Sequence, residues 1–148
     1  MGILTGKRAL IVGVATDRSI AWGIAQAMHA QGAELAFTYG AERLKERVTP
    51  LAESLGSKII LPLDVTVDAQ IDAVFEKLRQ DWGHFDILVH AVAYAPAEAL
   101  AGEFVAATTR QAFAIAHDVS SYSLTALSRG AAPLMAGNTV VVKTPETS

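Results

Sequence analysis

The sequence contains no cysteine among its 148 residues and no excess of positive charge, with 12 Lys and Arg against 15 Asp and Glu. The missing thiols exclude disulfides, iron–sulfur clusters and a cysteine nucleophile. A net charge of −3 provides no basic field for nucleic acid or anionic lipid. The longest uncharged apolar stretch, residues 87–97, is far shorter than the roughly 20 residues that span a bilayer. We therefore expect one globular, cytoplasmic domain without a nucleic-acid or membrane partner.

Short apolar runs alternate with helical patterns along most of the chain. Ala9–Val12 is a continuous apolar run stopped by Gly13, which is typical of a buried strand, and apolar residues then recur at helical spacing up to Gly32. The same pattern predicts strands at 35–39, 58–63, 86–90 and 140–142, and helices at 44–55, 71–82 and about 113–134. Such alternation predicts an α/β fold with a doubly wound parallel sheet that binds ligands at the carboxyl ends of its strands.

The connection after the first strand carries the first candidate site. Gly13 would let the backbone approach a phosphate, and Ser19 and Ile20 stand where a helix begins and its free N–H groups attract an anion. An ordinary glycine turn with a serine N-cap explains the same residues. The spacing alone leaves both interpretations open.

Longer motifs carry a resemblance to a known family. They are Gly13-x5-Ser-Ile-Ala-x-Gly-Ile-Ala, then Gly32-Ala-Glu-Leu-Ala-Phe-Thr-Tyr39, Asp64-Val65, Val89-His90 and Ile115-Ala-His-Asp-Val-Ser-Ser-Tyr-Ser123. Together they resemble the bacterial NADH-dependent enoyl-acyl-carrier-protein reductases, which are divergent short-chain dehydrogenase/reductases. The resemblance implies a Rossmann fold, NADH as cofactor, and reduction of the trans-2 double bond of an enoyl thioester in fatty-acid biosynthesis.

The resemblance assigns roles to particular positions. Gly13, Ser19 and Ile20 correspond to the turn that binds the pyrophosphate, and Asp64 and Val65 to the pair that contacts the adenine. For Asp64, a turn acid or a helix N-cap is the alternative role.

Two further positions are assigned in the same way. Val92 corresponds to a residue on the nicotinamide side of the cofactor, with core packing as its alternative role, and Ala95 to a backbone contact with the substrate. Gly40 stands where the family usually has a glutamine, and no acid after Tyr39 is placed for a ribose 2′-hydroxyl. Arg43 could favour a 2′-phosphate instead, although the resemblance favours NADH.

The last residues depart from the family pattern. Where the family has two tyrosines and a lysine, one tyrosine being the candidate proton donor, this sequence reads Lys143-Thr-Pro-Glu-Thr-Ser148. We therefore expect an incomplete Rossmann domain over residues 1–142, truncated after about five strands, with residues 143–148 as a departing tail. We assign no catalytic residue and no metal site, and we expect weak NADH binding with negligible turnover.

Two alternative functions and the self-association of this chain remain as hypotheses. A catalytically silent partner of intact reductase subunits would use the same fold. A receiver-like signalling module is suggested by Asp64 after the third strand and Lys143 after the fifth, although Val12-Gly13 lacks the acidic pair that would bind Mg²⁺. Self-association is expected because Val140–Val142 would form an edge strand and the helix after Ser120 carries few charges.

Overall fold

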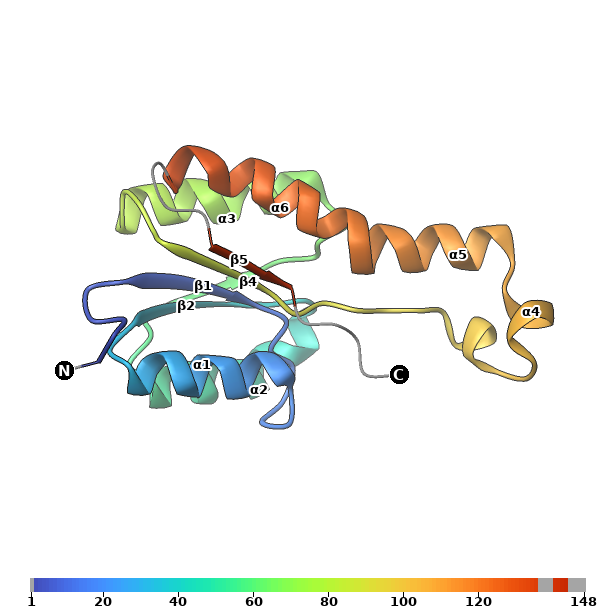
Figure 1. The fold of residues 1–148 in the computed structure, drawn as a ribbon, viewed down its shortest axis with the longest axis horizontal. Helices are drawn as coiled ribbons and strands as arrows, with labels where there is room; N and C mark the ends of the chain where they lie inside the picture. Colours follow the sequence, from blue (N-terminus) through green and yellow to red (C-terminus); the bar gives the residue numbers. More distant parts are fainter. Residues whose placement is uncertain (1, 136–139, 144–148) are drawn as a thin grey trace.

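The sheet is the centre of the molecule (Figure 1). The structure is a computed structural model, and it describes residues 2–135 and 140–143. Within them, five parallel strands pair in the order β3-β2-β1-β4-β5. These strands are β1 (Arg8–Val12), β2 (Glu34–Tyr39), β3 (Ile59–Pro62), β4 (Ile87–His90) and β5 (Val140–Lys143). Every strand predicted from the sequence is confirmed.

The strand order separates two of the hypotheses. An order of 3-2-1-4-5, with β1 in the middle, is that of the Rossmann fold, whereas receiver-like domains use 2-1-3-4-5. The doubly wound Rossmann-like prediction is therefore confirmed. The receiver-like module is wrong as a fold, because β3 pairs outside β2 and not next to β4.

Helices cover both faces of the sheet, as Figure 1 shows. The first two, α1 (Ile20–Ala30) and α2 (Glu42–Ser54), lie on one face, and α3 (Asp68–Asp81) and α6 (Ser123–Ala131) lie on the other. Alternate residues of β1 divide the core between them: Leu10 belongs to the cluster with α3 and α6, and Ile11 to the cluster with α1. Burial on both faces explains why β1 is apolar without interruption.

The long helix predicted from about Phe113 to Leu134 is interrupted. It begins earlier, as α5 (Arg110–His117), because the Oγ1 of Thr109 accepts a hydrogen bond of 3.1 Å from the N–H of Ala112. A π-helical turn, η2 (Asp118–Tyr122), then leads into α6, and a 3₁₀ turn, η3 (Ala132–Leu134), follows. Hydrophobic spacing alone does not register an inserted residue of this kind.

The exposed apolar surface lies elsewhere than predicted. In α6, Leu127 is fully buried, and a Cβ at Gly130 would lie only 2.4 Å from a ring carbon of Phe75 in α3. The expectation of an apolar patch after Ser120 is therefore wrong for this helix, because α3 covers it. Apart from Ile3 near the N-terminus, the most exposed large apolar side chains of the described residues are those of Leu100, Phe104, Val105 and Phe113, each at least 62% exposed.

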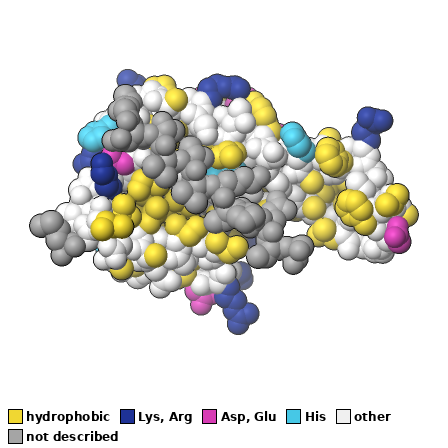
Figure 2. All heavy atoms as spheres, in the orientation of Figure 1, with side chains coloured by type: hydrophobic (Ala, Val, Ile, Leu, Met, Phe, Trp, Pro, Cys, Tyr) yellow, Lys and Arg dark blue, Asp and Glu magenta, His cyan; other side chains and the backbone are white. Residues whose placement is uncertain are grey.

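Those side chains belong to a projecting segment that we call the arm. It consists of η1 (Ala97–Leu100), α4 (Phe104–Ala107) and α5, and it extends away from the sheet in Figure 1. Figure 2 shows hydrophobic side chains gathered on this end of the molecule. The two short helices were not predicted from the sequence. They are too brief to produce a periodic pattern.

Candidate functional site

A groove of about 510 Å³ crosses the carboxyl ends of four strands. Its walls follow β1, β2, β3 and β4 and are completed by Val119 of η2. The lining residues are Val12, Gly13, Val14, Ala15, Thr38, Gly40, Ala41, Arg43, Leu44, Leu63, Asp64, Val65, Ala91, Val92, Ala93, Tyr94 and Val119. Connections leave β1 toward one side of the sheet and β4 toward the other, which is where doubly wound sheets bind ligands.

Gly13 is required by the sheet at the centre of this groove. Val12 pairs with His90, so the two chains leave β1 and β4 side by side, and the N–H of Ala91 donates to the carbonyl of Val12 at 2.9 Å. Gly13 has a φ of +121°, and a Cβ there would lie 2.2 Å from the carbonyl oxygen of Ala91. Only glycine satisfies both conditions.

Ser19 holds the connection between β1 and α1. Its Oγ accepts hydrogen bonds from the N–H groups of Ala15 at 2.9 Å and Thr16 at 3.0 Å. Ser19 occupies the N-cap position, but its side chain makes no capping bond to the helix. The serine N-cap interpretation is therefore wrong in its usual sense. The N–H groups of Trp22 and Gly23 donate to the carbonyl of Ser19, and no side chain caps the first turn, so the N–H groups of Ile20 and Ala21 are the ones left for an anion.

Asp64 follows β3 and shapes a tight turn. Its Oδ1 accepts from the N–H of Thr66 at 2.9 Å and from the Oγ1 of Thr66 at 2.7 Å, while its own N–H donates to the Oε1 of Gln70 at 2.7 Å. Val65 is buried in the core cluster beside α3. The turn-acid interpretation describes the Asp64 side chain, and both residues also line the groove.

A serine joins the segment after β4 to the π-helical turn. The Oγ of Ser120 accepts from the N–H of Tyr94 at 2.9 Å and donates to the carbonyl of Tyr94 at 3.1 Å. Val92, two residues earlier, is partly buried against the core, so its predicted packing role is present. Ser120 thus holds the groove wall that contains Val92 and Tyr94.

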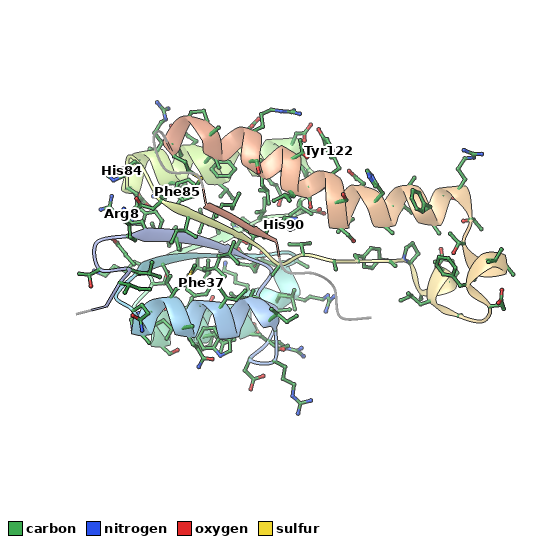
Figure 3. The ribbon with its side chains drawn as sticks, in the orientation of Figure 1. Arg8, Phe37, His84, Phe85, His90 and Tyr122 are labelled. Carbon is green, nitrogen blue, oxygen red and sulfur yellow. The ribbon has the colours of Figure 1, made fainter. Side chains whose placement is uncertain are left out.

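The end of β4 is anchored by a buried polar pair. His90, labelled in Figure 3, is fully buried. Its Nε2 lies 2.7 Å from the Oγ of Ser123. The Ser123 hydroxyl donates to the carbonyl of Val119 at 2.6 Å, so its only hydrogen is committed and Nε2 of His90 carries the shared proton. The contact ties the last residue of β4 to α6, next to Val119 in the groove.

The opposite ends of the strands carry charged side chains. The carboxylate of Asp86 accepts from the N–H of Arg8 at 2.9 Å and from Nζ of Lys7 at 3.3 Å. Burial alone would raise the pKa of Asp86, but these two hydrogen bonds and the Lys7 charge outweigh it and leave the pKa below its usual value. Arg8 also lies over the ring of Trp82, 5.6 Å from its centroid.

The groove brings together four of the seven positions predicted from the sequence. Gly13, Asp64, Val65 and Val92 line it. Ser19, Ile20 and Ala95 are outside the lining; Ile20 opens α1 with 47% of its surface exposed.

Sequence reasoning missed several groove residues. They are mainly small or apolar positions such as Val14, Thr38 and Val119. For the first two, the signal was their place at the carboxyl end of a predicted strand. Val119 could not be found in this way, because its position depends on the π-helical turn.

Two kinds of feature are absent from residues 2–135 and 140–143. No group of three His, Cys, Asp or Glu side chains among them is placed to hold a metal ion. No helix in these ranges has the length and apolar character needed to cross a membrane.

The strand order and the position of the groove define a protein of the Rossmann class. Residues 13–146 match the family model described as enoyl-(acyl carrier protein) reductase. The chain is 54% identical over 129 residues to the enoyl-(acyl-carrier-protein) reductase (NADH) FabI of Salmonella typhimurium, covering 87% of this chain and 49% of that protein. The Haemophilus influenzae FabI is 48% identical over 142 residues, covering 96% of this chain and 54% of that protein. This chain belongs to the enoyl-(acyl-carrier-protein) reductase family.

Solved structures show the same similarity. The reductase (NADH) of Aquifex aeolicus superposes with a TM-score of 0.92 at 48% identity, covering 96% of this chain and 56% of that chain. The reductase of Anaplasma phagocytophilum, solved in complex with NAD, gives 0.91 at 43% identity, covering 97% and 55%. This chain therefore spans about half the length of the relatives that it matches.

Proposed function

We propose that this chain is the cofactor-binding part of an enoyl-acyl-carrier-protein reductase and that it binds NADH across the groove. The observation that carries the proposal is the position of the groove at the carboxyl ends of β1 to β4, where the strand order reverses. The cofactor would supply the hydride for the double bond. The residues of this chain would bind and orient it.

The groove residues fit an extended dinucleotide. Gly13 exposes the backbone in the groove where the chain leaves β1 beside β4. The start of α1, which no side chain caps, follows it. The pyrophosphate would lie near Gly13, Ser19 and Ile20, because a helix N-terminus attracts negative charge. The adenine would lie toward Asp64 and Val65, with the nicotinamide near Val92.

The proposed substrate is an enoyl thioester on acyl carrier protein. It would approach along the segment after β4, where Ala95 would offer a backbone contact. Residues 1–142 would form the Rossmann unit of the reductase, and the residues from 143 onward would depart from the family pattern. We assign the proton donor to none of the side chains in the groove. The silent-partner hypothesis shares this fold and adds that the chain packs against intact reductase subunits.

Calorimetric titration with NADH tests this proposal. Gly40 tolerates a side chain, since a Cβ there meets nothing nearer than the carbonyl oxygen of Leu63 at 3.9 Å. Gly40→Trp should place an indole in the groove and weaken NADH binding at least tenfold, roughly 1.4 kcal/mol. Gly23→Trp is the matched control, because Gly23 lies on α1 away from the groove and a Cβ there has open space. Equal affinities, or no binding by the unmutated chain, would contradict the proposal.

We also propose that copies of this chain associate. The described residues place β5 at one edge of the sheet, with β4 as its neighbour, and the exposed arm carries Phe104 and Phe113. Unpaired edges and large apolar surfaces both favour contacts between chains. Light scattering should show a species heavier than one chain. If the β5 edge is responsible, Val141→Lys should reduce the mass of this species. If the arm is responsible, Phe104→Ser should reduce it. A compact monomer at tens of micromolar would contradict the association.

A further inference from the structure

One wall of the groove is held at both of its ends. We call residues 91–94 the β4 wall; all four line the groove. Just before the wall, Nε2 of His90 lies 2.7 Å from the Oγ of Ser123, and both side chains are fully buried. At its far end, the Oγ of Ser120 bonds to the N–H and to the carbonyl of Tyr94. Two serines of one helical segment therefore fix the β4 wall.

The π-helical turn η2 brings the two serines to this wall. The N–H of Ser123 donates to the carbonyl of Asp118, which is the hydrogen-bond spacing of a π-helix. In an α-helix, that N–H would donate to the carbonyl of Val119 instead. Here the Val119 carbonyl accepts from the Ser123 hydroxyl at 2.6 Å. The Ser123 side chain therefore donates where the backbone would donate in an uninterrupted α-helix.

Ser123 also links this turn to the sheet. Its Oγ contacts His90 of β4 and the carbonyl of Val119, and Val119 lines the groove. Val119 and Val92 pack against the same core cluster. Buried hydrogen-bond networks make such an arrangement rigid. We therefore expect Ser123 to hold Val119 in a fixed position relative to Val92.

We infer that Ser123 is a positioning residue for the nicotinamide half of the cofactor: through His90 and Val119 it holds the β4 wall where the ring can enter. The inference rests on the proposed function, because it concerns the same groove. Ser123 itself is fully buried and is not among the lining residues, so it acts through its neighbours. Its loss should affect the half of the cofactor beside Val92 and spare the half beside Asp64.

Calorimetric titration with NADH and with ADP-ribose, which lacks the nicotinamide, tests this role. Ser123→Ala should weaken NADH binding about tenfold and ADP-ribose binding less than about twofold, because a displaced wall disturbs only the nicotinamide end. The matched control is Ser121→Ala, which removes the same hydroxyl from the same turn. Ser121 is exposed and is not among the lining residues, so both affinities should stay unchanged.

A double variant separates positioning from stability. Partial unfolding lowers both affinities by the same factor, so only a displaced wall changes the ratio of NADH affinity to ADP-ribose affinity. Ser123→Ala combined with His90→Leu replaces both members of the buried pair by apolar side chains. This combination should recover part of the stability that Ser123→Ala loses, without restoring the contact between β4 and η2. The affinity ratio should therefore stay low, and chemical denaturation of the same samples measures the stability.

The outcomes separate the inference from the proposed function. The inference is overturned, while cofactor binding stands, if Ser123→Ala leaves the affinity ratio unchanged, if Ser121→Ala lowers it equally, or if the ratio recovers with stability in the double variant. If the unmutated chain binds neither ligand, both fall. Selective loss of NADH binding in Ser123→Ala and in the double variant, with Ser121→Ala unaffected, supports the inference.

Discussion

The two ends of the sheet carry different kinds of side chain. At the amino ends of the strands, Lys7, Arg8 and Asp86 are joined by hydrogen bonds and ion pairs, and Arg8 reaches the carbonyl of Trp82 at 2.8 Å. At the carboxyl ends, small and apolar residues surround a groove, and Asp64 is the one acid among its lining residues. Figure 3 shows Arg8 and His90 at these opposite ends.

This difference suggests that the two ends have different roles, one in stability and one in the proposed binding. Charged side chains at the amino ends satisfy one another, so that end contributes to stability. The carboxyl ends keep N–H groups, backbone and one arginine available, so we assign the proposed cofactor binding to them. A fold that closed both ends would have no place for a cofactor.

The largest effect is expected from Gly13→Ala. The new Cβ would meet the carbonyl oxygen of Ala91 at 2.2 Å, on a backbone with a φ of +121°. We expect the free energy of unfolding to fall by about 3 kcal/mol, because both β1 and β4 must shift. Gly23→Ala is the control: Gly23 lies within α1 with open space around it, and the change should raise stability by up to about 1 kcal/mol. Chemical denaturation of both variants measures the contrast.

An unchanged stability of Gly13→Ala would show that the carboxyl ends can separate without cost. The close approach of β1 and β4 would then not define the groove.

A smaller loss is expected at the amino ends. Asp86→Asn should lower the free energy of unfolding by about 1–2 kcal/mol near neutral pH, because a partly buried carboxylate that accepts from Arg8 and Lys7 is replaced. The pKa of Asp86 is lowered in the folded state, so its stabilisation is present above the ordinary carboxyl range and disappears as pH falls through that lowered value. The difference from the unmutated chain should therefore shrink below about pH 4.

Glu76→Gln provides the comparison for Asp86. Hydrogen bonds from Arg79 and Gln80 lower the pKa of Glu76, but Glu76 lies on the exposed face of α3. Solvent screens the exposed pair of Glu76 and Arg79, so the midpoint temperature of thermal unfolding should change little at any pH. If Glu76→Gln proved as damaging as Asp86→Asn, partial burial would not explain the role of Asp86.

The smallest effect is expected from Ser120→Ala. Its hydroxyl makes both hydrogen bonds to the backbone of Tyr94, so its loss should loosen the groove wall after β4 without unfolding the sheet. We expect NADH affinity to fall about threefold and amide exchange near Tyr94 to rise. Ser54→Ala is a suitable control, since its hydroxyl donates within its own helix, to the carbonyl of Leu51. Equal exchange in the two variants would contradict the role of Ser120.

The sequence predicted the sheet well for a physical reason. Strands buried on both faces, such as Ala9–Val12, must be continuously apolar, and Gly13 marks where the first one ends. Gly13 was predicted because it ends the first strand, whereas Asp64, Val65 and Val92 were assigned by resemblance to the reductase family; all four follow strands and line the groove. By contrast, the bonds of Ser19 to Ala15 and Thr16 depend on loop geometry that no periodic pattern encodes.

The misplaced apolar patch has a different cause. A helix with few charges is exposed or buried according to what packs on it, and the contact of Gly130 with Phe75 is set by tertiary structure. The π-helical turn at Asp118–Tyr122 also shifts the faces of α5 and α6 relative to one continuous helix. The fifth strand was predicted correctly, and its side chains lie outside the described residues.

The central claim is that the carboxyl ends bind the cofactor while the amino ends stabilise the sheet. Hydrogen exchange with and without saturating NADH tests it most directly. We expect slower exchange in residues 13–21, 63–66 and 91–95, with no change around Arg8, Glu34 and Trp82. Protection centred on the amino ends, or no protection after β1 and β4 at saturating NADH, would contradict it.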